Sequence, residues 1–194
     1  NTLSEIGQSA FGTCSSLKDI DLPDSLTRIG SQAFEQSGLT SLTLPDSVRS
    51  VGRQAFLECR SLVSAKLSSG MTTIPSQMFQ RCTSLRTVTI PASITSIANT
   101  AFDGCDLTTI YYGGTQAQWE ALLEQVKSVS TQTYEMMMDA NVTVSGGGDP
   151  STPTEPDDPS SAIPTPVNVT AESTVDGVQL EWNIPLSVGD TKWD

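Results

Sequence analysis

The four cysteines are the residues whose type and spacing could do chemistry. Cys14, Cys59, Cys82 and Cys105 each close the same five-residue motif, written AFGTC, AFLEC, MFQRC and AFDGC. Thiolates at regular spacing could bind zinc, form disulfides or act as nucleophiles. The chain has no histidine, so it can supply neither a Cys–His pair nor a Ser–His–Asp triad. What the thiols do therefore depends on the elements that position them.

The cysteines belong to a repeat of 22 or 23 residues. Each unit begins at an apolar residue four positions before the motif's Ala (or Met), and these first residues are Ile6, Ile29, Val51, Ile74 and Ile97. This period, with a Leu-x-x-Leu-x-Leu core, predicts leucine-rich repeat coils that each give one strand to a parallel sheet. The predicted strand segments span residues 17–22, 39–44, 62–67, 85–90 and 107–110. The expected fold class is an α/β repeat solenoid.

All four cysteines occupy the ninth position of their unit, and Ser37 occupies it in the second unit. Stacked units place this position in a column with a spacing of ~4.8 Å. One thiol per unit along a line does not give zinc four convergent ligands. A disulfide such as Cys82 to Cys105 is permitted by distance but leaves one of three adjacent thiols over. We therefore favour small buried side chains that pack the interior and meet a backbone group.

The sequence IGSQAFEQSGLTSLTLPDSVRSVGRQAFLEC, residues 29–59, resembles the BspA-like leucine-rich repeats of bacterial surface proteins. The resemblance covers residues 1–113 in five units. Local departures are Pro75 and Ala98 in place of Gly and Met78 in place of Ala, and the second and fifth units are one residue short after the ninth position. The resemblance implies a non-catalytic, adhesin-like module in an extracellular or cell-surface protein, whose partner is a protein or glycoprotein on another cell or matrix.

Residues 114–144 are predicted to cap the stack with a helix and a closing strand. Thr115 and Gln118 have the spacing of a capping box, and Trp119 begins an apolar stripe at helical spacing. A helix carrying Trp119 would cover the apolar end that a stack of units exposes. The segment DANVTV, residues 139–144, resembles the closing strand of BspA-like arrays. Residues 136–138 are three methionines, which we interpret as cap filler rather than as a binding surface.

Residues 145–163 are rich in Pro, Gly, Ser and Asp and predict a linker. Residues 164–194 contain two alternating apolar stretches around Asp176-Gly177. With Trp182 and Pro185, this segment resembles the opening of a fibronectin type III domain. It holds about 30 of the roughly 100 residues of such a sandwich, so we expect a partial, all-β domain that cannot close a core.

Alternation within the predicted strands defines an outward face of small hydroxyl side chains. The candidate binding residues on and beside it are Ser64, Lys66, Arg86, Thr87, Thr89, Thr109 and Tyr111. Solenoids use such extended faces to bind partners. The alternative is that Ser and Thr are present because they suit a parallel sheet. Asp19, Asp21 and Asp24 lack the Gly and Glu of a calcium loop and are interpreted as a solvated strand edge.

The charge distribution excludes several classes of partner. The net charge is −12, yet residues 1–122 carry eight basic and ten acidic side chains, so most of the acidity follows residue 122. Without a basic stripe, neither nucleic acid nor an anionic membrane surface is expected as a partner. No phosphate-binding or dinucleotide motif is present, and we expect no enzyme activity, no cofactor and no metal.

Because the chain starts within the repeat, we expect a piece of a longer protein. An accessory module of a secreted hydrolase and a structural spacer remain alternatives.

Overall fold

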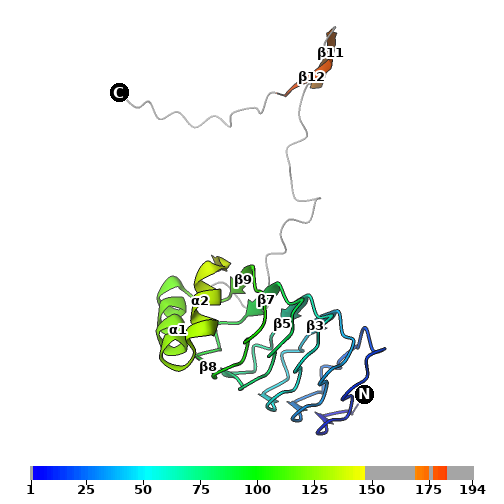
Figure 1. Ribbon diagram of the computed structural model, residues 1–194, viewed down its shortest axis with the longest axis vertical. Helices are drawn as coiled ribbons and strands as arrows, with labels where there is room; N and C mark the ends of the chain where they lie inside the picture. Colours follow the sequence, from blue (N-terminus) through cyan, green and yellow to red (C-terminus); the bar gives the residue numbers. More distant parts are fainter. Residues whose placement is uncertain (1, 147–168, 175–176, 183–194) are drawn as a thin grey trace. The chain divides into compact units, whose positions relative to one another are not determined.

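The computed structural model describes residues 2–146, 169–174 and 177–182 (Figure 1). The chain divides into two units, Asn1–Pro153 and Thr154–Asp194, which are described separately. In the first unit the repeats stack side by side as coils, and two helices follow the last coil (Figure 1). This is the predicted solenoid, with a parallel sheet along one side.

The main sheet takes one strand from each of the second to fifth repeats and a last strand from the end of the cap. Its members are β3 (Ser41–Thr43), β5 (Ser64–Lys66), β7 (Thr87–Ile90), β9 (Thr109–Tyr112) and β10 (Asn141–Val144). The order is β10-β9-β7-β5-β3, and every pairing is parallel. The predicted strand at residues 17–22 does not form. Thr40 N donates to Lys18 O at 3.0 Å on one edge of that segment. Among the described residues, no strand lies along its other edge.

A second row of short strands begins each repeat, and the sequence pattern did not predict it. Its members are β1 (Glu5–Ile6), β2 (Arg28–Ile29), β4 (Ser50–Val51), β6 (Thr73–Ile74) and β8 (Ser96–Ile97). The row divides into β1-β2-β4 and β6-β8. At the residue after the strand, Gly30, Gly52 and Ala98 each donate N–H to the preceding unit, at 2.8 to 2.9 Å. Pro75 has no N–H to donate, so the ladder is interrupted between β4 and β6.

A stack of phenylalanine rings forms the middle of the core. Phe11, Phe34, Phe56, Phe79 and Phe102 stack in order, with centroids 5.1 to 5.6 Å apart. The last four are at most 1% exposed. On the inner side of the main sheet, each strand buries an apolar residue that pairs with the one on the next strand. These residues are Leu42, Ala65, Val88 and Ile110. Each unit thus buries its apolar face only against its neighbours, as expected for a solenoid.

Each coil turns sharply at two residues in the left-handed backbone region. These form one column at the fourth position and another at the eighth: Ser9, Gln32, Gln54, Gln77 and Thr100, then Thr13, Gln36, Glu58, Arg81 and Gly104. Left-handed non-glycine residues are unfavourable in isolation. Here the turns also pair between units, because Phe34 N donates to Ala55 O at 2.8 Å and Phe56 N to Met78 O at 3.0 Å. This cross-unit pairing holds the strained turns in place.

The cap consists of two helices, where the sequence predicted one. Helix α1 (Gln116–Val129) begins with the predicted capping box of Thr115 and Gln118, and α2 (Thr131–Asp139) follows directly. Ser130 separates them because its backbone is extended and its hydroxyl accepts from Thr133 N, which starts a new helix. Trp119 is 4% exposed and its ring lies 5.3 Å from that of Tyr112. The cap therefore covers the end of the stack as expected.

Two side-chain contacts fasten the cap to the last units. The Gln125 side-chain amide forms hydrogen bonds with the edge of β8, as a neighbouring strand would. Its Oε1 accepts from Ile97 N at 2.9 Å and its Nε2 donates to Ile97 O at 3.3 Å. This pair closes the free edge of β8. At the second contact, buried Thr133 donates to Asp103 Oδ1 at 3.2 Å. Of the three predicted filler methionines, Met137 is buried, Met136 is half-buried and Met138 is exposed.

In the second unit the structure describes one antiparallel hairpin of β11 (Val169–Thr174) and β12 (Gly177–Trp182). Its register runs from Val169 opposite Trp182 to Thr174 opposite Gly177. These are the two predicted strands of the segment that resembles a fibronectin type III opening. Pro185 and most of the predicted linker lie outside the described residues.

Candidate binding surface

The outward side chains of the main sheet form two parallel columns, which we call the strand face. One column is Ser41, Ser64, Thr87, Thr109 and Asn141, and the other is Thr43, Lys66, Thr89, Tyr111 and Thr143. The residues of the outer strands β3 and β10 are exposed, and those of the three central strands are half-buried. Because the register has no slip, the face presents one polar pair per strand at intervals of ~4.8 Å.

Six of the seven predicted binding residues lie on this face, and Arg86 lies beside it. Lys66 is the one cation among its ten residues, and Tyr111 is the one aromatic side chain. Arg86 precedes β7, where its Nη2 lies 3.2 Å from Asp106 Oδ2 and its Nη1 donates to Thr83 O at 2.9 Å. These contacts hold the Arg86 side chain against the fourth and fifth units, beside the strand face.

The residues that the fifth strand adds to the strand face were not predicted from the sequence. Asn141 and Thr143 of β10 lie opposite Thr109 and Tyr111 of β9. The alternation in DANVTV was visible, but it did not reveal the partner strand or the parallel direction. The two helices return the chain so that β10 runs parallel to β9, and that return determines which residues join the surface.

The ninth-position column is a ladder of thiols bound to backbone carbonyl groups. Cys59 Sγ donates to Phe34 O at 3.0 Å, Cys82 Sγ to Phe56 O at 3.1 Å and Cys105 Sγ to Phe79 O at 3.0 Å. Ser37 Oγ is 3.3 Å from Cys59 Sγ, at the matching place in the second unit.

All four thiols are free. The predicted burial is wrong for Cys14, which is exposed because no described unit packs against that side of the first coil. Burial raises the pKa of Cys105 to about 12. A thiol with so high a pKa is largely protonated at neutral pH and is a poor nucleophile. Within the described residues, no group of three or more His, Cys, Asp or Glu side chains is arranged to hold a metal ion.

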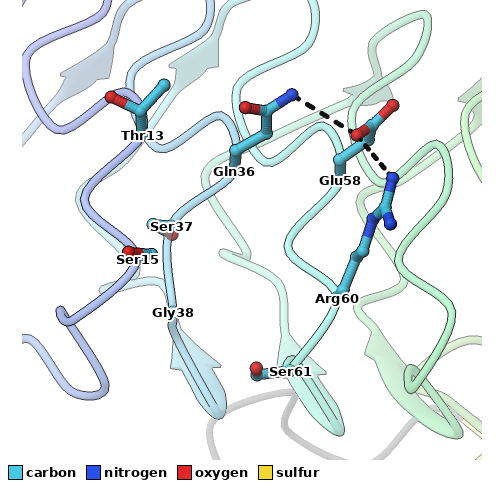
Figure 2. A pocket seen from close by; sticks show the side chains of 8 residues that line it. All are labelled: Thr13, Ser15, Gln36, Ser37, Gly38, Glu58, Arg60 and Ser61. Carbon is cyan, nitrogen blue, oxygen red and sulfur yellow. Dashed lines mark hydrogen bonds and ion pairs between the residues drawn. The ribbon is translucent and has the colours of Figure 1, made fainter.

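A polar pocket of about 420 Å³ lies outside the strand face, across the first three units (Figure 2). In Figure 2, Gly38 lies between Ser15 on one side and Arg60 and Ser61 on the other. None of these residues was predicted from the sequence. The signal that could have indicated them is the missing residue of the second unit, where one residue, Gly38, stands between the ninth position and the next Leu.

In the described part of the chain, no helix is long and apolar enough to cross a bilayer. The stacked coils, parallel main sheet and helical cap define a leucine-rich repeat solenoid. The family described as the BspA type leucine rich repeat region matches residues 1–119 in six copies, one more than the five predicted units. The chain belongs to this family.

Solved structures of bacterial leucine-rich repeat proteins are similar to this chain. The T. pallidum leucine rich repeat protein is 33% identical with a TM-score of 0.53, over 56% of this chain and 51% of that one. A leucine rich cell surface protein from Faecalibacterium prausnitzii is 28% identical with a TM-score of 0.50, over 69% and 34%. The pneumococcal vaccine antigen PcpA shares the fold at 22% identity, with a TM-score of 0.54, over 73% and 33%.

The chain therefore spans between about a third and a half of the length of these structures. No curated protein matches it.

Proposed function

We propose that this chain is a non-catalytic, adhesin-like protein-binding module of a bacterial cell-surface or secreted multidomain protein. The observation that carries the proposal is the strand face, a continuous five-strand surface of polar side chains with Lys66 and Tyr111 near its middle. Repeat solenoids use such extended surfaces to bind partners. The ligand is a protein or glycoprotein on another cell or in the matrix.

An extracellular or cell-surface location is supported by membership of the BspA type family and by the similarity to the F. prausnitzii cell surface protein. We further propose the division into repeats at residues 1–113, cap at 114–144, linker at 145–163 and a fibronectin type III segment at 164–194. The hairpin β11–β12 supports the last assignment because two alternating antiparallel strands open such a sandwich.

The experiment is a binding screen of the full chain against matrix proteins, mucins and glycans. The test variant combines Lys66→Glu with Tyr111→Ala, which change the one cation and the one aromatic ring of the strand face. Arg86 is left unchanged because it is tied to Asp106 and to backbone carbonyl groups. The matched control is Arg49→Glu, which reverses an exposed charge between the two rows of strands, before β4.

A protein ligand that is lost in the double variant and kept in the control supports the proposal. We expect at least a tenfold loss, because anchor residues of this type contribute about 2 kcal/mol or more to an interface. A ligand that binds both variants equally places recognition elsewhere. If no ligand binds, the alternatives, a structural spacer or an accessory module of a secreted hydrolase, are favoured.

A further inference from the structure

The polar pocket owes its position to the shortened second unit. Between the ninth position and the following Leu, the first and third units have two residues and the second has only Gly38. Gly38 N donates to Cys14 O at 3.1 Å, and a Cβ on Gly38 would lie 2.1 Å from Ser15 O. The backbone at Gly38 therefore lies close to the first coil, and the longer segments of the first and third units flank it on either side.

The third unit contributes a guanidinium group, that of Arg60, which Glu58 holds in place. Arg60 Nη2 donates to Glu58 Oε2 at 3.0 Å, and the Arg60 side chain is 68% exposed. Glu58 also accepts from Arg81 Nη1 at 3.1 Å and from Gln36 Nε2 at 3.4 Å, so both of its oxygens are engaged. The Glu58 carboxylate thus orients Arg60, whose remaining N–H groups are available to a ligand.

The charged groups of the pocket lining are one carboxylate, Glu58, and one guanidinium, Arg60. Arg81 lies outside the lining and adds a second positive charge next to Glu58, 3.1 Å from its Oε1. Figure 2 shows the Arg60 side chain extending toward Glu58. A guanidinium with free N–H groups binds carboxylates, often in a bidentate manner.

The rest of the lining offers hydroxyl groups and no apolar side chain. Thr13, Ser15 and Ser61 are exposed in and around the opening (Figure 2). Hydroxyl groups both donate and accept hydrogen bonds, as the hydroxyls of a sugar do. The volume of about 420 Å³ lies within the range of roughly 300–1,000 Å³ that is usual for small-molecule sites.

We propose that this pocket is a binding site for a carboxylate-bearing sugar residue of the uronic acid type. Arg60 pairs with the carboxylate, and the hydroxyls of Ser15 and Ser61 bind the ring hydroxyls. A peptide is a poorer fit because the lining gives its apolar side chains nothing to pack against. The site is separate from the strand face, so its failure in the test would leave the proposed protein-binding function untouched.

The experiment follows the backbone amides of the full chain by NMR during titration with methyl β-D-glucuronide. Methyl β-D-glucoside, which lacks only the carboxylate, and sodium acetate, which lacks the sugar, are the comparison probes. Arg60→Gln removes the guanidinium, and Ser61→Asp puts a competing carboxylate in the pocket. Arg53→Gln is the matched control, because Arg53 is an exposed arginine that donates to Gln77 elsewhere on the solenoid.

We expect saturable shifts at Gly38 and Ser61 with a millimolar Kd for the glucuronide. The Kd should rise about tenfold or more for the glucoside and for Arg60→Gln, because a charge-assisted hydrogen bond is lost. Binding should disappear in Ser61→Asp and stay unchanged in Arg53→Gln.

Three results would overturn the proposal. Acetate that binds as tightly as the glucuronide indicates a simple anion site. A glucoside that binds equally well shows that Arg60 does not select the carboxylate. The absence of saturable shifts up to ~50 mM glucuronide shows that the pocket is not a sugar site.

Discussion

The thiol ladder leads to a quantitative prediction about alkylation of Cys105. Cys105 is half-buried, donates to Phe79 O at 3.0 Å and has a pKa raised to about 12 by burial. At pH 8 a thiol with an ordinary pKa of about 8.5 is about one-quarter thiolate, whereas a thiol with a pKa of about 12 is ~0.01% thiolate. The reactive fraction is therefore lower by about 2,000-fold.

Part of this loss is offset because a more basic thiolate is a better nucleophile. With a Brønsted exponent of about 0.4 to 0.5, a pKa increase of roughly 3.5 raises intrinsic reactivity by about 40-fold. The net expectation is an alkylation rate about 50-fold below that of an ordinary exposed thiol. Partial burial limits access of the reagent, so about 50-fold is the smallest slowing expected.

The assay is alkylation of the native chain by iodoacetamide at pH 8, followed by mass spectrometry of each cysteine peptide. Exposed Cys14 is the internal reference, and the fully buried Cys59 and Cys82 should label only after unfolding. Labelling of Cys105 within about fivefold of Cys14 would refute the reasoning from burial and pKa. A disulfide between Cys82 and Cys105 in the native chain would refute the free-thiol ladder itself.

Three further predictions concern stability and pH. Gly38→Ala should lower the free energy of unfolding by about 2 kcal/mol or more, measured by urea denaturation, because its Cβ would lie 2.1 Å from a backbone oxygen. Gln125→Ala should lower it by about 1–2 kcal/mol, since two hydrogen bonds to the edge of β8 are lost. Hydrogen bonds from Arg81 and then Arg60 hold the pKa of Glu58 below its usual value. Because the pKa of Glu58 is lower in the folded state, these contacts stabilise the fold at higher pH. Their contribution is lost as pH falls through that pKa. Arg81→Gln should therefore raise the titration midpoint of Glu58, measured by carboxyl NMR.

The two stability variants, Gly38→Ala and Gln125→Ala, each have a matched control. Gly7→Ala should be tolerated, because a Cβ at Gly7 would meet nothing within 4 Å. Gln116→Ala removes one exposed side-chain hydrogen bond, to Glu120, and should have little effect. Equal destabilisation in a variant and its control would contradict the packing argument. A Glu58 midpoint that does not move in Arg81→Gln would contradict the electrostatic one.

The strand positions of the second to fifth units were predictable because each is encoded within one repeat. An apolar residue at every second position, together with a 22–23 residue period, is sufficient to predict Leu42, Ala65 and Val88 on the inner side. The strand at residues 17–22 was wrongly predicted because the repeat pattern alone was taken as sufficient. Its residues carry the same pattern, but a strand also needs neighbours, and the pattern does not record how many a segment has.

The attachment of the cap to the stack shows a different limit. The Ser130 cap that separates α1 from α2 is local, but the attachment of α2 to the stack depends on the contact of Asp103 with Thr133, 30 residues apart. Similarly, Gln125 is an ordinary polar helix residue in the sequence, and its role follows only from its position over Ile97. Local propensity contains no information about such contacts.

The sequence by itself determined the repeat, the direction of its side chains, the helical cap and the absence of histidine chemistry. These properties depend on short-range periodicity and on composition, which are complete within each unit. Only the tertiary structure decided which carbonyl groups of the preceding unit the thiols of Cys59, Cys82 and Cys105 bind. It also decided that Arg86 is tied to Asp106 and that a missing residue opens a pocket beside Arg60. Each of these depends on the distance between adjacent coils, which is set by packing between units some 22 residues apart in the chain.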